Sequence, residues 1–283
     1  MIYLSTGGFS HLNGYETSKL FAENNITNIE LSGGTQDVGQ SDKLLSLNSV
    51  CNFQIHNYFP PPQEPFVFNL ASEDELISAK SFHHAHTAID LAEKLGSKFY
   101  SFHAGFLIDP DVNDLGKQFT KGKLNKRVSA VEVFVDRVNR ISSYAKEKGI
   151  MILLENNVIS NPNLSYFDTN PFLMTDHSEA LQIMNSTDDN VGLLVDVAHL
   201  KVSSESENFC KHEYLDSTRE YTFAYHFSDN DGKSDTNDVV KSDSWFWSDV
   251  RKDLNYYTLE VYDQNLKVLT QQIELTEKML SIV

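Results

Sequence analysis

Six successive apolar stretches of the chain end at or near a side chain that can bind a metal ion or transfer a proton. In chain order these residues are His56, His103, Glu155, Asp196, His226 and Glu260. His199 follows Asp196 by three residues, and Asp235 and Asn237 follow His226 in a segment rich in carboxylates. Such a recurrence predicts one shared site rather than several unrelated polar residues.

Each of these residues has a simpler interpretation when taken alone. A histidine at a strand end is more often hydrogen-bonded within the protein, and a charged loop is usually a solvated surface. The joint pattern favours a metal site, because converging carboxylates are costly unless a cation offsets their charge. Imidazole mixed with carboxylate best suits Zn²⁺ or Mn²⁺, with Co²⁺, Fe²⁺ or Mg²⁺ as further candidates. The spacing leaves open whether one or two ions bind.

The elements that must position these residues alternate between strands and helices. Nearly continuous apolar runs, typical of parallel strands covered by helices, occupy residues 2–5, 28–32, 52–56, 98–103, 150–155, 191–196, 222–227 and 256–262. Amphipathic helices are predicted between them, two of which are followed by the stop signals Gly96 and Gly149. The order predicts an α/β protein, a single (β/α)₈ TIM barrel domain over residues 1–283.

A barrel of this kind brings the carboxyl ends of its strands together at one end, where active sites of the fold lie. The rival architecture is a doubly wound sheet. It is disfavoured because "STGGFSHLNG", after the first strand, does not match the dinucleotide-binding pattern G-x-G-x-x-G.

The composition limits the partners. The formal net charge is −17, and the chain contains only five arginines. Nucleic acid is therefore disfavoured, because proteins that bind phosphate backbones usually carry a basic face. The sequence has no apolar run long enough for a membrane helix, no recognisable signal peptide and two cysteines. We expect a cytoplasmic protein without a membrane partner, and the oligomeric state is not predicted.

Seven short segments make the chain similar to a known superfamily. They are "IHNYFPP", "VFNLAS", "FHAGF", "LLENN", "LLVDVAHL", "HFSDNDG" and "TLEVY". Through them the sequence resembles the xylose-isomerase-like barrels, which include endonuclease IV and metal-dependent sugar isomerases and epimerases. The likeness covers nearly the whole chain, but it does not select one activity, since the fold and metal ligands are shared across several chemistries.

The endonuclease IV pattern implies two metal sites that share a ligand. His56 and His103 would hold one ion, and Glu155 would bridge to a second site, completed by Asp196, His226 and Glu260. A third ion in that family uses a histidine that matches His199 and an Asp-x-His pattern that begins at Asp235. This chain has Asn237 in place of the last histidine, and asparagine is a weaker, neutral ligand.

The ketose 3-epimerase pattern implies a single ion, held by Glu155, Asp196, His226 and Glu260. In that family the two glutamates are acid and base on opposite faces of the substrate, which gives Glu155 and Glu260 the catalytic roles. His199 matches a histidine that contacts substrate, while Gly232 replaces an arginine of the family pattern. His56 and His103 would then line the sugar pocket.

Three functions are compatible with these residues. The first is a metal-dependent sugar or sugar-phosphate isomerase or epimerase, in which carboxylate acid/base groups transfer a proton through an enediolate. The second is an endonuclease IV-like phosphodiesterase that cleaves at abasic sites, which would need a basic groove. The third is a non-catalytic relative that binds a sugar or a metal. The negative charge favours the first, with a small sugar or sugar phosphate as partner.

Two further features are interpreted as structural. The histidines of "HHAH" at residues 83–86 lie in a predicted helix away from the strand ends and are interpreted as surface residues. Trp245, Phe246 and Trp247 lie at a spacing that is more often packing than a platform for a sugar ring.

Overall fold

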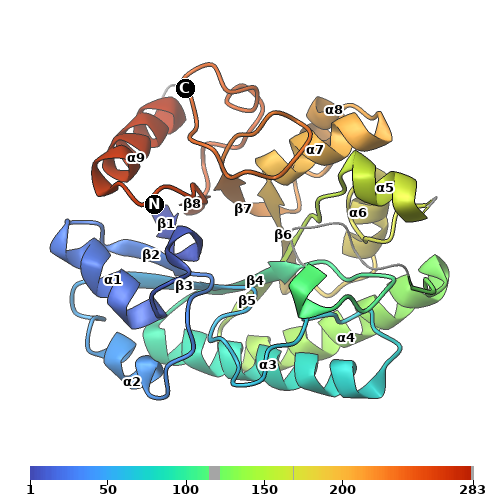
Figure 1. The fold of residues 1–283 in the computed structure, drawn as a ribbon, viewed down its shortest axis with the longest axis horizontal. Helices are drawn as coiled ribbons and strands as arrows, with labels where there is room; N and C mark the ends of the chain where they lie inside the picture. The colour runs from blue at the N-terminus through green and yellow to red at the C-terminus, as the bar shows by residue number, and fades with distance from the viewer. Residues whose placement is uncertain (115–121, 168, 282–283) are drawn as a thin grey trace.

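The computed structural model describes residues 1–114, 122–167 and 169–281, and its centre is a closed barrel of parallel strands (Figure 1). The strands pair in chain order, and the last pairs with the first. Their bounds are β1 (Ile2–Ser5), β2 (Asn28–Leu31), β3 (Asn52–His56), β4 (Phe99–His103), β5 (Met151–Glu155), β6 (Val191–Asp196), β7 (Thr222–Phe227) and β8 (Tyr256–Leu259). The predicted barrel and its strands are confirmed.

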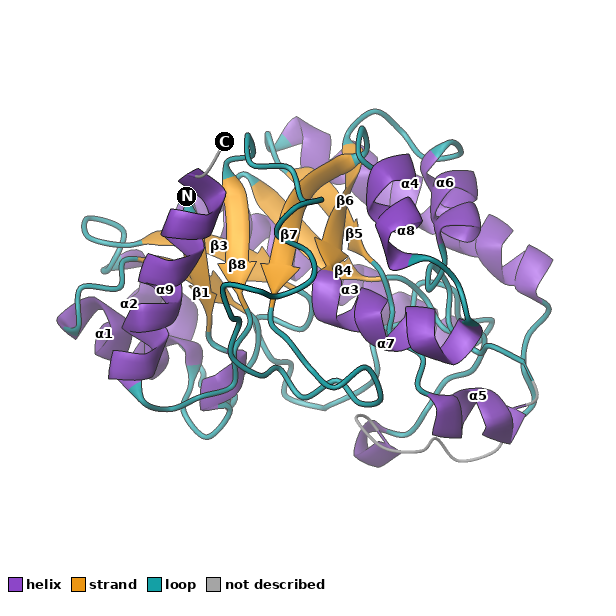
Figure 2. Cartoon of the chain, turned by 90° about the horizontal axis from the view of Figure 1, so that it is seen from above, coloured by secondary structure: helices purple, strands orange, loops and turns teal. Residues whose placement is uncertain are grey.

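Helices cover the outside of the barrel (Figure 2). They are α1 (Gly14–Glu23), α2 (Gln40–Leu45), α3 (Glu75–Leu95), α4 (Arg127–Glu147), α5 (Asn161–Phe167), α6 (His177–Met184), α7 (Val197–Glu207), α8 (Lys211–Ser217) and α9 (Leu266–Ser281), with 3₁₀ turns at Gly7–Phe9 and Val112–Asp114. Gly96 ends α3 at a φ of 73°, and Gly149 follows α4 at 69°, so both predicted stop signals are confirmed. Within the described residues, none of the helices combines the length and apolar character of a membrane span.

The strands divide their side chains between the helices and the barrel interior. Toward the helices they contribute to the main core, for example through Leu4, Ile29 and Phe53. The interior holds a separate apolar layer made of Tyr3, Leu153, Leu194, Ala224 and Tyr256. Side chains on one face of a strand recur every second residue. The residues two positions beyond this layer therefore also point into the barrel, one level closer to the carboxyl ends of the strands.

The interpretation of "HHAH" as surface residues is wrong for one histidine. His83 is exposed, as expected, but His84 is buried. Helix α3 begins at Glu75, so the run lies in the helix interior, where one face packs on the barrel. The His84 ring stacks on Tyr58, and its Nε2 lies 3.1 Å from the carbonyl oxygen of Asn57.

The aromatic residues near the end of the long loop after β7 are packing residues, as predicted. Phe246 and Trp247 are both buried, and the Phe246 ring stacks on Phe227 of β7 with 5.2 Å between ring centroids. The Trp247 indole donates a hydrogen bond to the carbonyl oxygen of Lys241 at 2.7 Å. These contacts anchor the loop that carries Asp235.

Candidate metal centre

Four of the six strand-end residues form one buried cluster, here called the inner group: Glu155, Asp196, His226 and Glu260. The first three lie two residues beyond the interior layer of their strands, and Glu260 follows β8 directly. Strand pairing sets Asp196 directly opposite His226. One ligand atom from each of the four residues lies within 4.8 Å of every other. The barrel thus brings together residues that are up to 105 positions apart in the chain (260 − 155).

The geometry of the inner group is centred on one imidazole nitrogen. His226 Nδ1 lies 2.9 Å from Glu260 Oε2, 3.4 Å from Glu155 Oε1 and 3.8 Å from Asp196 Oδ2. Asp196 is fixed from outside, because its Oδ1 accepts the backbone N–H groups of Ala198 and His199 and so caps α7. This leaves Asp196 Oδ2 directed at the cluster.

A second cluster, here called the histidine group, consists of His56, His103 and Glu155. Glu155 Oε2 lies 3.3 Å from His56 Nε2 and 3.4 Å from His103 Nδ1. Glu155 and His103 are paired directly opposite each other on β5 and β4. Glu155 therefore contributes one carboxylate oxygen to each group, and His103, with 27 % of its side chain exposed, marks the side that opens to solvent.

Unpartnered polar atoms make the inner group a candidate cation site. Both carboxylate oxygens of Glu155, Asp196 Oδ2 and His226 Nδ1 are buried and have no hydrogen-bond partner among the described residues. Buried polar atoms in proteins are nearly always paired, and unpaired ones are expensive. Three carboxylate oxygens and one imidazole nitrogen that share this condition fit a divalent cation, because the ion supplies the charge and the coordination that these atoms lack.

The electrostatics of the inner group point the same way. The pKa of Asp196 is raised to about 7, mainly by burial. The charge of His199 opposes this rise, and the charges of Glu155, Asp235 and Glu260 add to it. Burial also raises the pKa of Glu155, but the charges of His103, His226 and His56 outweigh it and hold this pKa well below its usual value. The carboxylates thus depend on nearby positive charge, which protonated imidazoles or a divalent cation can supply.

The remaining candidates, here called the third group, are His199, Asp235 and Asn237. His199 Nδ1 lies 3.0 Å from the carbonyl oxygen of Asn156, and its Nε2 lies 3.2 Å from Asp235 Oδ2. The side chain of Asn237 makes no described contact with either residue, although its backbone oxygen accepts the N–H of Tyr262 at 2.9 Å. The structure therefore joins His199 to Asp235, and among the described residues no hydrogen bond links the Asn237 side chain to either of them.

Comparison with known proteins assigns the fold to a family. The family model described as "Xylose isomerase-like TIM barrel" matches residues 40–256. The chain belongs to this family. A comparison with curated protein sequences finds no match.

Several solved structures share this xylose isomerase-like fold over the whole chain. A D-tagatose 3-epimerase-like protein aligns with a TM-score of 0.75 and 18 % identity, covering 100 % of this chain and 97 % of the other. D-psicose 3-epimerase from Clostridium cellulolyticum H10, in a structure with D-tagatose, aligns at 0.68 and 12 %, covering 99 % of each chain. The TTHB071 protein from Thermus thermophilus, soaked with ZnCl₂, aligns at 0.64 and 17 %, covering 98 % of each. At these identities the likeness shows the fold.

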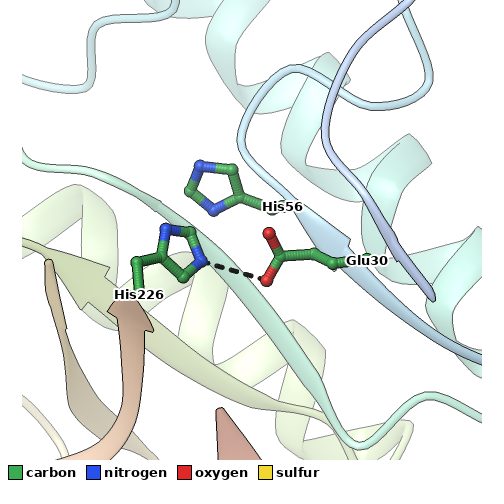
Figure 3. Close-up of side chains that lie close together, drawn as sticks. All are labelled: Glu30, His56 and His226. Atoms are coloured by element: carbon green, nitrogen blue, oxygen red, sulfur yellow. Dashed lines mark hydrogen bonds and ion pairs between the residues drawn. The ribbon is translucent and has the colours of Figure 1, made fainter. Parts of the chain in front are cut away.

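Glu30 is a residue of this xylose isomerase-like barrel to which sequence reasoning gave no role. It lies on β2 and is completely buried. Its Oε2 lies 3.0 Å from His226 Nε2, and Figure 3 shows the two side chains facing each other beside His56. The available signal was its position near the end of a strand, which it shares with the residues of the inner group.

Tyr262 is a second residue that the sequence did not single out. Its hydroxyl donates a hydrogen bond to Glu260 Oε1 at 3.2 Å, while half of the residue is exposed. The ring packs so closely on the loop after β1 that a Cβ atom at Gly7 would lie 2.8 Å from the tyrosine oxygen. Local sequence gave no signal for this contact, because it depends on closure of the barrel between β8 and β1.

Proposed function

We propose that this protein is a metal-dependent sugar isomerase or epimerase. The observation that carries the proposal is the inner group, in which two glutamates from β5 and β8 share a buried cluster with Asp196 and His226. Membership of the xylose isomerase-like family supports it, as does the fold shared with proteins described as ketose 3-epimerases. The substrate class proposed is a small ketose.

The residues proposed to hold a divalent ion are those of the inner group, whose unpartnered atoms fit one. A bound Zn²⁺ or Mn²⁺ would supply Lewis-acid polarisation of the substrate oxygens next to the reacting carbon. The histidine group offers a second position, and Glu155 would serve both. Tyr262 holds the outward oxygen of Glu260, which leaves the other oxygen directed at the cluster.

In this proposal Glu155 and Glu260 transfer the proton. Each carboxylate lies within 3.4 Å of the same imidazole nitrogen, so both border one small volume. A ketose that enters this volume exposes the C–H bond next to its carbonyl. One glutamate accepts that proton, and the other returns a proton to the opposite face of the carbon, which inverts its configuration. If the same glutamate returns the proton to the same carbon, the configuration does not change. If the proton is delivered to the neighbouring carbon, the sugar is isomerised.

The decisive experiment measures metal content and proton transfer together. Protein stripped with a chelator and refilled with Mn²⁺ or Zn²⁺ is first assayed for bound metal by elemental analysis. It is then incubated in D₂O with D-fructose or D-tagatose, and carbon-bound deuterium is followed by NMR. We expect one or two ions per chain and metal-dependent deuterium incorporation at the carbon next to the carbonyl. A protein that rebinds no metal contradicts the proposal.

The alternative of a phosphodiesterase has one observation in its favour, namely that Glu155 joins the inner group to the histidine group as a two-metal site requires. The formal net charge of −17 opposes the phosphodiesterase function. The nearby Lys201 is ion-paired within the protein, since its Nζ donates to Asp229 Oδ1 at 2.7 Å and also to the carbonyl of Asn230. We expect the zinc-loaded protein to leave an abasic-site duplex intact; cleavage would favour the phosphodiesterase. Metal binding without either reaction would indicate a non-catalytic relative.

A further inference from the structure

The Glu30 carboxylate lies in the barrel interior and is held by one of its two oxygens. Its Oε2 accepts a hydrogen bond from Thr258 Oγ1 at 2.8 Å and another from the Tyr256 hydroxyl, and it faces His226 Nε2 at 3.0 Å. A buried carboxylate is strongly unfavourable unless donors compensate it. Strands β2, β7 and β8 therefore meet at this one oxygen, directly beside the inner group.

These contacts place a proton on Nε2 of the His226 ring. A carboxylate oxygen that already accepts two hydroxyl hydrogens can approach Nε2 at hydrogen-bond distance only if that nitrogen carries a proton. In the neutral ring the lone pair then belongs to Nδ1, the nitrogen that lies 2.9 Å from Glu260 and 3.4 Å from Glu155. The ring is fully buried, so it cannot rotate without losing its contact with Glu30.

Glu30, His56 and His226 also lie near enough to one another to suggest a separate metal group (Figure 3). Two observations argue against that interpretation. Glu30 Oε2 is already occupied by three neighbouring groups, and of this carboxylate only Glu30 Oε1 is left buried without a hydrogen-bond partner among the described residues. His56 turns its Nε2 toward Glu155 at 3.3 Å, while its Nδ1 lies 3.0 Å from Ser101 Oγ. Both ring nitrogens of His56 thus have partners outside this group, and His226 Nε2 already faces Glu30 Oε2.

We propose that Glu30 is a positioning residue of the metal centre. Its carboxylate holds His226 in the Nε2-protonated form and so directs the Nδ1 lone pair at a divalent cation bound by the inner group. Carboxylates that orient metal-binding histidines in this way also increase the basicity of the ligand. This inference rests on the metal-binding part of the proposed function and is independent of the sugar chemistry.

The test compares zinc affinity of the full-length protein and Glu30→Gln, measured by competition with a fluorescent chelator. Glutamine has the same size but no charge, and its amide can also donate to Nε2, which would place the proton on Nδ1. We expect zinc binding to weaken about 10- to 100-fold. The matched control is Thr258→Val, which removes a hydrogen bond to the same oxygen but leaves Glu30 facing His226. We expect it to weaken binding less than about threefold.

The outcomes separate the two proposals. If the wild-type protein binds no zinc, the metal-binding part of the proposed function fails. If wild type binds zinc and folded Glu30→Gln binds it equally well, or if Thr258→Val weakens binding as much as Glu30→Gln, the role of Glu30 is overturned.

A measurement on the zinc-loaded wild-type protein covers the case in which Glu30→Gln does not fold. Long-range ¹H–¹⁵N NMR of the histidine rings, with His226 assigned by its absence in His226→Gln, should show a proton on Nε2 and none on Nδ1. A proton on Nδ1 instead would contradict the proposal.

Discussion

The inner group and the third group lie side by side at the same end of the barrel, and His199 Nδ1 is only 3.5 Å from Glu155 Oε1. Both contain histidine and aspartate, but their hydrogen bonding differs. In the inner group Asp196 Oδ2 and His226 Nδ1 are buried without a hydrogen-bond partner in the described part of the chain. In the third group, His199 is hydrogen-bonded by both ring nitrogens, to the Asn156 carbonyl and to Asp235.

The difference shows why residue types do not suffice to define a metal site. The protein itself supplies partners to both ring nitrogens of His199, and Asp235 is partly exposed to solvent, so neither residue depends on an ion. In the inner group, Asp196 Oδ2 and both oxygens of Glu155 are buried without a hydrogen-bond partner among the described residues. A cation is therefore expected first where hydrogen bonds are missing, and the following predictions test that rule from the largest expected effect to the smallest.

The largest effect is expected for Glu155→Gln, because Glu155 contributes one oxygen to the inner group and the other to the histidine group. Turnover should fall by about 10³-fold or more, since a group that transfers a proton is lost. Metal content, measured by elemental analysis, should fall in parallel. Glu147→Gln, an exposed substitution in α4, is the matched control and should change neither quantity. Full metal content in Glu155→Gln would show that the ion is held elsewhere.

A pair of isosteric substitutions tests the comparison directly. Asp196→Asn removes a charge from the inner group but retains an oxygen that can cap α7, and we expect metal affinity to fall about 100-fold or more. Asp235→Asn removes the same charge from the third group, where the loss should be below about tenfold. The metal affinity of both variants is measured by competition with a fluorescent chelator. Equal losses in the two variants would remove the distinction between the groups.

Asn237→His asks whether the third group can be converted into a metal site. A histidine here would complete the pattern with His199 and Asp235, so elemental analysis should show additional zinc without any gain of sugar turnover. The backbone at Asn237 has a φ of 49°, which asparagine tolerates better than histidine, so we expect a stability loss of about 1 kcal/mol. Unchanged zinc in a folded variant would show that this group does not bind an ion.

His84 extends the comparison to a buried histidine whose ring nitrogen faces a backbone carbonyl. Burial lowers its pKa to about 4, against the hydrogen bond to Asn57, from an ordinary value of 6.5. Between these values the unfolded chain binds more protons, so the free energy of unfolding falls as the pH decreases from 6.5 toward 4. From pH 6.5 to 5, urea denaturation should show the free energy of unfolding of the wild type falling by about 1.6 kcal/mol more than that of His84→Gln. Equal losses would contradict a neutral, buried His84.

Much of the fold and of the candidate site could be predicted from local pattern. Each strand is an apolar run, and inward residues recur every second position, so Leu153 leads to Glu155 and Leu194 to Asp196. The residues that escaped prediction depend on contacts between distant segments. Predicting a role for Glu30 requires the position of His226, and predicting one for Tyr262 requires the position of the loop after β1. His84 was misjudged because the start of α3, and hence its buried face, is a boundary that sequence places poorly.

The sequence by itself determined the barrel, the order of its strands and the residues at their carboxyl ends, because these follow from apolar periodicity and from the geometry of parallel strands. Tertiary structure decided which of those residues are buried without hydrogen-bond partners and are therefore the candidates for binding a cation. Asp196 ends strand β6 and Asp235 lies in the loop after β7; they are the same residue type at the same end of the barrel, and they differ in burial and hydrogen-bond partners. Those properties arise only when the closed barrel removes water from some polar atoms and supplies partners to others.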